Sequence, residues 1–200
     1  GIRHRDCGMK NFVHMFEQVD SSTKTTVKVN ALAEYFRTAC DKDKVWAIAI
    51  MSHRRPKRPM TTKLMREWAA EISDVPLWLF EESYHIAGDL AETITLLCHG
   101  EKNKVGGSLS ELIEIIIGLR GEDESEQKKV VQELWKSLDY SACFVFNKLL
   151  TGGFRMGISR KLMTRALAKA TSIDEPIIAH KLMGKWNPAT IDFQNLVLDT

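Results

Sequence analysis

The segment from Leu149 to Ala168 combines residue types that suit phosphate binding. Three glycines, Gly152, Gly153 and Gly157, precede an amphipathic helical pattern that begins just after Ser159. Glycine permits left-handed backbone and a close approach of ligand to main chain. A helix N-terminus offers free N–H groups to an anion. We therefore expect a phosphate to bind at Ser159, beside the amides of Gly153 and Gly157.

Cations surround these glycines and the expected helix start. Arg155 lies between the last two glycines, and Arg160 and Lys161 fall in the first turn. Because the helix macrodipole disfavours positive charge at that end, Arg160 and Lys161 require a compensating anion. We expect all three to contact phosphate. The structural alternative is a simple loop between two helices, with Arg155 paired to an acidic residue.

Two further groups of polar and basic residues form a second tier of candidate phosphate contacts. The first lies at another helix start, and the second in a loop bounded by Pro56 and Pro59. These candidates are Lys24, Thr25, Lys28, Arg54, Arg55, Lys57 and Arg58.

The two signs of charge are segregated along the chain, although the net charge is only +2. Residues 140–173 contain no acid, whereas residues 67–92 contain seven acids and no Lys or Arg. The cations of the basic stretch are Lys148, Arg155, Arg160, Lys161, Arg165 and Lys169. Such segregation favours a basic face that binds a polyanion. The alternative is a solvated surface without a partner.

The sequence offers little for catalysis or metal binding. It contains no Walker A motif, dinucleotide fingerprint, zinc-protease helix motif or nucleophile elbow. His85, Asp89 and Glu92 share approximate helical spacing, but Gly88 interrupts that register. Asp89 with Glu92 is explained as a capping box instead. We expect no catalytic residue and no metal site.

Apolar residues recur at helical spacing almost throughout, and no hairpin signal occurs, so the sequence predicts an all-α fold. Helix starts are indicated by Asp89, Ser108, Ser159 and Asp174. The expected helices span 10–19, 25–39, 43–52, 62–73, 76–86, 90–98, 109–119, 124–138, 141–150, 160–171, 176–183 and 190–197. The tryptophans fall within apolar helical patterns and are expected in the core: Trp46, Trp68, Trp78, Trp135 and Trp186.

The chain of 200 residues is long enough for a hydrophobic core without disulfide or metal, in one domain or two small ones. Its four cysteines are scattered without metal-site spacing, which favours reduced thiols and a cytoplasmic protein. No apolar run is long enough to span a membrane. Gly1 to Gly8 is interpreted as a leader or as added residues, with a helical domain from 9 to 200.

An ordered set of segments resembles one known family. The segments are Lys28 to Phe36, Arg54 to Pro59 leading to Leu64 to Trp68, Pro76 to Tyr84, Gly88 to Thr93, and Leu149 to Ala168. Together they resemble the N-terminal DNA-binding domain of ATP-dependent DNA ligases, in particular the bacterial ligases related to archaeal and eukaryotic replicative enzymes. The resemblance runs from Met9 to about Leu198.

This resemblance implies a compact domain of about a dozen short helices that grips nicked duplex DNA through backbone phosphates, with little base selectivity. It implies roles in DNA replication, repair and recombination, and a monomer associated with the nucleoid of a bacterium. Nucleotidyl transfer belongs to a downstream catalytic domain with a K-x-D-G lysine, and that motif is absent here. ATP and Mg²⁺ are therefore expected for the full-length enzyme and no cofactor for these residues, which should be inactive alone.

Two other functions stay open at the level of sequence. One is an α-helical protein-interaction domain without a nucleic-acid partner, in which the acidic stretch would matter as much as the basic one. The other is a small enzyme whose site the motifs do not reveal.

Overall fold

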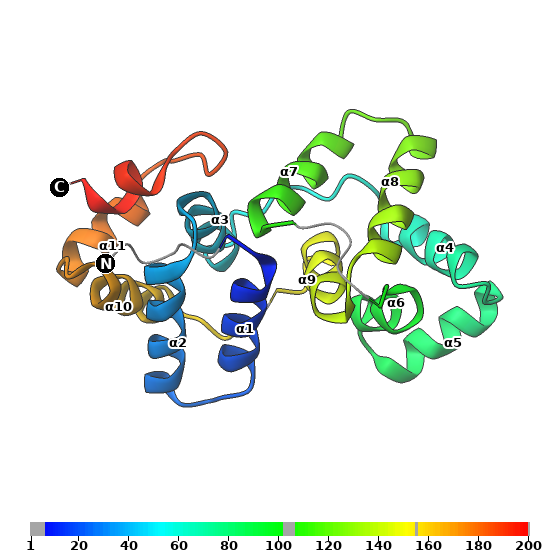
Figure 1. Cartoon of the computed structure of the whole chain (residues 1–200), viewed down its shortest axis with the longest axis horizontal. Helices are drawn as coiled ribbons and strands as arrows, with labels where there is room; N and C mark the ends of the chain where they lie inside the picture. The colour runs from blue at the N-terminus through cyan, green and yellow to red at the C-terminus, as the bar shows by residue number, and fades with distance from the viewer. Residues whose placement is uncertain (1–6, 102–106, 155, 200) are drawn as a thin grey trace. The chain divides into compact units, whose positions relative to one another are not determined.

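The computed structural model describes residues 7–101, 107–154 and 156–199, and the prediction of an all-α fold is confirmed over them (Figure 1). The helices are α1 (Met9–Asp20), α2 (Thr25–Thr38), α3 (Asp41–Met51), α4 (Thr62–Ile72), α5 (Leu77–Ala87), α6 (Leu90–Cys98), α7 (Leu109–Leu119), α8 (Glu124–Ser137), α9 (Tyr140–Thr151), α10 (Arg160–Thr171), α11 (Glu175–Met183) and the π-helical turn η1 (Gln194–Leu198).

Side-chain caps explain several of the helix starts. Asp89 accepts the Glu92 N–H, and Ser159 accepts the Leu162 N–H, as the sequence predicts. Asp174 precedes α11 without such a bond, although Pro176 occupies the first turn. Ser108 directly precedes α7, and its hydroxyl lies 3.0 Å from that of Ser110.

The last expected helix was placed too early. Residues 190–197 were predicted to be helical, but the helical turn begins at Gln194. Asn187 holds the preceding residues in a turn, since its side chain accepts the Ala189 N–H and its carbonyl accepts the N–H of Thr190. The apolar spacing there reflects burial of Phe193 and Val197 rather than an early helix start.

The described chain divides into two compact units. Of the described residues, unit 1 comprises 7–55, 108–110 and 156–199, and unit 2 comprises 56–101, 107 and 111–154. Unit 1 thus holds α1 to α3, α10, α11 and η1, while unit 2 holds α4 to α6, α8, α9 and most of α7. The helices of both units lie in the region 9–200, for which the sequence allows one domain or two small ones.

In unit 1, α2 packs against both α1 and α10. The apolar side chains at this centre are almost fully buried, namely Phe12, Val19, Leu32, Phe36, Ile48 and Leu167. Burial of each such side chain contributes about 1.5–3 kcal/mol, so this core fixes α2 and α10 side by side.

In unit 2, a polar network crosses the core. The Trp135 indole donates to the Asn147 side-chain oxygen at 2.6 Å, and the Asn147 amide donates to the Thr95 hydroxyl at 3.0 Å. All three side chains are buried, so these bonds satisfy groups that are costly to leave unpaired. They join α8, α9 and α6.

The prediction that all five tryptophans are buried is wrong for Trp78. Trp46, Trp68 and Trp135 are buried and Trp186 is half-buried, but Trp78 is 71% exposed. Helix α5 buries Phe80 instead, which faces away from Trp78.

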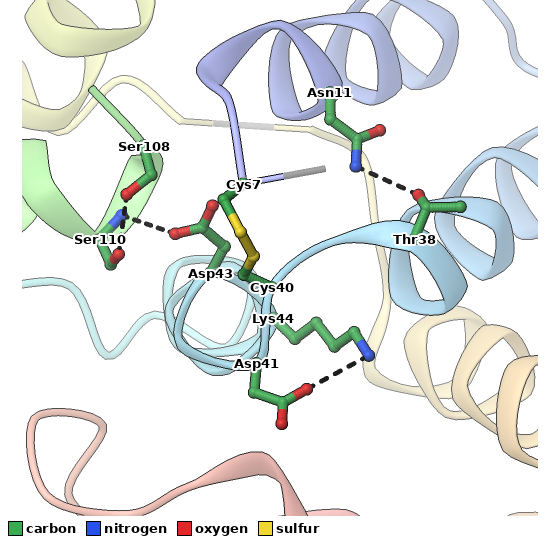
Figure 2. Close-up of a disulfide and its surroundings, with 9 residues drawn as sticks. All are labelled: Cys7, Asn11, Thr38, Cys40, Asp41, Asp43, Lys44, Ser108 and Ser110. Atoms are coloured by element: carbon green, nitrogen blue, oxygen red, sulfur yellow. Dashed lines mark hydrogen bonds and ion pairs between the residues drawn. A yellow bond between two sulfur atoms is a disulfide. The ribbon is translucent and has the colours of Figure 1, made fainter. Parts of the chain in front are cut away.

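A disulfide joins Cys7 to Cys40, so the expectation that the cysteines are reduced is wrong for this pair (Figure 2). The two cysteines are 33 residues apart in isolated positions, and nothing in their spacing predicts the pairing. Cys40 is the residue before α3, and Cys7 belongs to the stretch interpreted as a leader. The end of that stretch is therefore fastened to unit 1. Nearby, the Asn11 amide donates to the Thr38 hydroxyl, which ties α1 to α2.

None of the helices in the described residues combines the length and apolar character needed to cross a membrane.

Candidate nucleic-acid interface

Two helix N-termini lie together at one end of unit 1. The Lys28 ammonium, in the first turn of α2, donates to the Gly157 carbonyl at 3.2 Å, just before α10 begins. Near the other end of both helices, the Arg37 guanidinium donates to the Lys169 carbonyl at 3.2 Å. Helices α2 and α10 therefore pack against each other with their N-termini close together.

Gly157 forms the turn that leads into α10. Its φ is +61°, in the left-handed region that disfavours residues with a side chain. A Cβ at this position would lie 2.9 Å from the Lys28 ammonium nitrogen. The glycine thus allows both the turn and its close contact with α2.

The N-terminus of α10 presents free donors to solvent. The Ser159 hydroxyl oxygen accepts the Leu162 N–H at 3.1 Å, and the Ser159 carbonyl accepts the Met163 N–H. The first-turn amides of Arg160 and Lys161 have no intrahelical acceptor. The hydroxyl proton of Ser159 remains available, because a hydroxyl accepts and donates at once.

The side chains around these donors are positively charged. Arg160, Lys161 and Arg165 on α10 are exposed, and none of their side chains has a hydrogen bond or ion pair with another described residue. Lys24, the residue before α2, is also exposed, and Thr25 follows it. Neither α2 nor α10 carries an acid in its first turn. Cations at two helix N-termini therefore stand uncompensated in this part of the structure.

Arg165 was not chosen from the sequence as a site residue. It lies four positions after Lys161, so the two share one face of α10. The sequence indicated Arg165 only as a cation outside the apolar face of the helix. We define the α2–α10 end as Lys24, Lys28, Ser159, Arg160, Lys161 and Arg165.

The structure gives Arg54 a structural role. Its guanidinium donates to the carbonyls of Leu182, Gly184 and Trp186, and it lies 4.4 Å from the centre of the Trp186 ring. These bonds satisfy carbonyls at the end of α11. The side chain is therefore occupied within unit 1.

The remaining residues of that loop are divided between the units. Arg55 belongs to unit 1 and is exposed. Lys57 is exposed and Arg58 is half-buried, and both belong to unit 2. The four basic residues of this loop thus do not form one group within a single unit.

Gly153 and Arg155 are the other two candidates from the glycine-rich segment. Gly153 belongs to unit 2, where its N–H donates to the Lys148 carbonyl at 3.2 Å and helps to end α9. That amide is therefore engaged rather than free for phosphate. Arg155 lies outside the described residues.

Cations from elsewhere in unit 2 neutralise part of the acidic stretch. Arg66 pairs with Glu81, Lys128 with Glu71, and Lys148 with Asp89.

Two of these pairs depress carboxyl pKa values. Burial alone would raise the pKa of Asp89, but the Lys148 ammonium and the Glu92 and Ala91 amides outweigh it, so the pKa lies below 3.8. The pKa of Glu71 is also lowered, and the hydrogen bond from Lys128 is the main cause. Among the described residues no three His, Cys, Asp or Glu side chains gather in a metal-binding group.

Comparison with known proteins gives one family. The family model described as DNA ligase N terminus matches residues 9–168. A search of the curated proteins found no match. The matched region runs from the start of α1 into α10, so it includes both helix N-termini of the α2–α10 end.

Proposed function

The chain belongs to the family of N-terminal domains of ATP-dependent DNA ligases, and on this basis we propose that its α2–α10 end binds the phosphate backbone of duplex DNA. The observation that supports this is the pairing of two adjacent helix N-termini, both with cations and neither with an acid in its first turn. Such an arrangement is destabilised in the free protein and stabilised by a bound polyanion.

The chemistry of a phosphate contact follows from the free groups. The amides of Arg160 and Lys161 and the Ser159 hydroxyl can donate to one phosphate oxygen. The side chains of Arg160, Lys161 and Arg165 neutralise charge along the strand. Lys24 supplies a further cation at the start of α2, beside Thr25. Lys28 holds Gly157 in place and contributes charge from there.

These contacts fall on groups that every nucleotide shares. A domain that serves nick sealing must accept any base pair, so phosphate contacts without base contacts suit that role. We propose nicked duplex DNA as the ligand and a monomer as the binding species. Replication, repair and recombination are the processes in which such a module acts.

Catalysis is proposed to reside outside these residues. The family implies ATP and a metal ion for the full enzyme, and we propose that a downstream catalytic domain binds them. The described residues offer no cluster of metal ligands, so no step of nucleotidyl transfer is assigned to them. We place the protein in the bacterial cytoplasm, at the nucleoid. Neither cysteine of the Cys7–Cys40 disulfide belongs to the α2–α10 end.

Anisotropy titration of a labelled duplex, nicked or intact, tests the proposal with the 200-residue chain. The variant Arg160→Ala/Lys161→Ala/Arg165→Ala should bind about 10- to 100-fold more weakly near 0.1 M salt, because each lost phosphate contact costs up to about one order of magnitude there. The matched control is Lys10→Ala/Lys129→Ala/Lys136→Ala, which removes three exposed cations elsewhere. Equal affinity of the two triple variants would refute the interface and would favour a protein-interaction domain.

A further inference from the structure

Helix α5 in unit 2 exposes a row of large apolar side chains. Trp78 is 71% exposed, Leu79 40% and Ile86 79%. At 100° per residue these three fall within about 100° of the helix circumference. The buried Phe80 faces the opposite side, toward the core. Exposed apolar groups clustered on one helix face mark an interaction surface, and tryptophan is enriched among residues that dominate binding energy.

A free carboxylate stands inside this row. Glu82 lies four residues after Trp78 and four before Ile86, which places it between them on the same face. It is exposed and has no hydrogen bond or ion pair with another described residue. We define the α5 ridge as Trp78, Leu79, Glu82 and Ile86. From Trp78 to Ile86 it runs about 12 Å along the helix.

The stretch of sequence that contains the α5 ridge is negative as well. Residues 67–92 contain no Lys or Arg, and cations from outside the stretch pair with only three of its seven acids. The side-chain carboxylates of the other four have no hydrogen-bond or ion-pair partner among the described residues; these four are Glu67, Asp74, Glu82 and Glu92. The ridge therefore combines apolar anchors with uncompensated negative charge.

We propose that the α5 ridge binds a basic amphipathic helix of a partner protein. The apolar face of that helix packs on Trp78, Leu79 and Ile86, and its Lys or Arg side chains pair with Glu82. This is the helix-recognition mode in which apolar residues at helical spacing supply affinity. The charge complementarity supplies orientation and partner choice.

Other occupants fit this surface less well. Nucleic acid and anionic lipid carry the same sign of charge as Glu82 and the other unpaired acids of residues 67–92. A second copy of this chain packed through a two-fold axis would bring the ridge against itself, Glu82 toward Glu82. A basic helix alone satisfies both the apolar anchors and the carboxylate. The inference is independent of DNA binding, because the ridge belongs to unit 2 and the α2–α10 end to unit 1.

The probe is an 18-residue acetylated peptide with Leu on one helical face and Lys on the other, labelled for anisotropy. Two control peptides have the same residues in scrambled order, or Glu in place of Lys. With the full chain, we expect the basic amphipathic peptide to bind at least tenfold more tightly than either control. Amide chemical shifts should change in α5.

Substitutions then localise the contact. Trp78→Ala should weaken binding of the basic peptide by about tenfold or more, as for an interface anchor. Glu82→Lys should weaken it several-fold, and added salt should diminish that difference. The matched controls are Met183→Ala, which truncates a side chain 66% exposed on α11, and Glu17→Lys, an exposed acid on α1. Both controls should leave peptide affinity unchanged. All four variants should keep the thermal midpoint of the parent chain.

Three outcomes would overturn the proposal. The first is equal binding by the scrambled peptide or by the Trp78→Ala chain. The second is a dimer in sedimentation that Trp78→Ala dissociates, because the ridge would then serve a second copy. The third is binding to phosphatidylcholine vesicles that Trp78→Ala abolishes, which would assign the surface to lipid. DNA affinity is measured on the same variants and should not change.

Discussion

At the scale of single residues, cations of the α2–α10 end differ in what they do for the free protein. Lys28 bonds the Gly157 carbonyl and so supports the turn before α10. The side chains of Arg160 and Lys161 make no hydrogen bond or ion pair with a described residue, and they lie at the positive end of α10. Substitution of Lys28 should therefore affect both folding stability and DNA binding. Substitution of Arg160 or Lys161 should weaken DNA binding without loss of stability.

We expect Arg160→Ala/Lys161→Ala to leave the free energy of unfolding unchanged or to raise it by about 0.3–1 kcal/mol per residue at low salt, because each change removes a cation from a helix N-terminus. Lys28→Ala should lower it by about 0.5–1 kcal/mol through the lost hydrogen bond. Urea unfolding of the three chains tests this. A less stable double variant would mean that those cations hold the fold together.

The Gly157 turn gives a test of positioning. Gly157→Ala should cost about 1–2 kcal/mol of stability from its positive φ, and it should also weaken DNA binding because the α10 N-terminus moves relative to Lys28. Gly88→Ala is the matched control, since Gly88 also has a positive φ but lies in open space in unit 2. It should cost similar stability and leave DNA affinity intact. Equal loss of DNA affinity in both would contradict a local role for Gly157.

The cysteines should differ in reactivity. Burial raises the thiol pKa of both Cys98 and Cys143 to about 12, so at pH 8 almost no thiolate forms. Cys7 and Cys40 are protected as a disulfide. We expect no thiol of the folded chain to react rapidly with Ellman's reagent. After mild reduction Cys7 and Cys40 should react, and Cys98 and Cys143 should react only on unfolding. Fast labelling of Cys98 in the folded chain would contradict its burial.

At the scale of elements, the sequence predicts the helices well. Helices α1 to α11 lie within two residues of the expected ranges, because their apolar spacing and caps such as Asp89 and Ser159 are local signals. The local pattern does not say which face of a helix meets another helix. Trp78 was expected in the core for that reason, while packing buries Phe80.

The start of α6 should respond to acid. Asp89 caps α6 and pairs with Lys148 on α9, and its pKa in the folded state lies below the ordinary 3.8. The stabilisation is therefore complete well above pH 3.8 and is lost as the pH falls through the folded pKa below it. Lys148→Met should lower stability at pH 7 by about 0.2–1 kcal/mol, as for partly exposed pairs.

Unfolding of Lys148→Met and the parent chain across pH 2–7 would measure that difference. It should shrink toward zero at the acid end, because protonated Asp89 no longer attracts Lys148. A difference that is the same at every pH would show that Lys148 stabilises unit 2 by packing rather than by charge.

At the scale of the whole molecule, the sequence does not predict which distant residues contact one another. Basic residues from positions 24–28 and 159–165 meet because α2 packs along α10, which no local motif reveals. The Cys7–Cys40 disulfide and the contacts of Arg54 with α11 are likewise set by tertiary structure. The glycine-rich segment and the cap Ser159 indicated the helix start at which we propose phosphate binding. The structure adds Arg165 to that group and engages Arg54 and the Gly153 amide elsewhere.

The most direct test of the central claim is the salt dependence of duplex DNA binding, with the parent chain and Arg160→Ala/Lys161→Ala measured side by side. If the parent neutralises five to eight phosphates, log K should fall with log salt concentration with a slope of about −4.5 to −7. The double variant should bind more weakly, with a slope smaller in magnitude by about 2. Unchanged affinity and slope in the double variant, or binding by the parent that ignores salt, would contradict phosphate binding at the α2–α10 end.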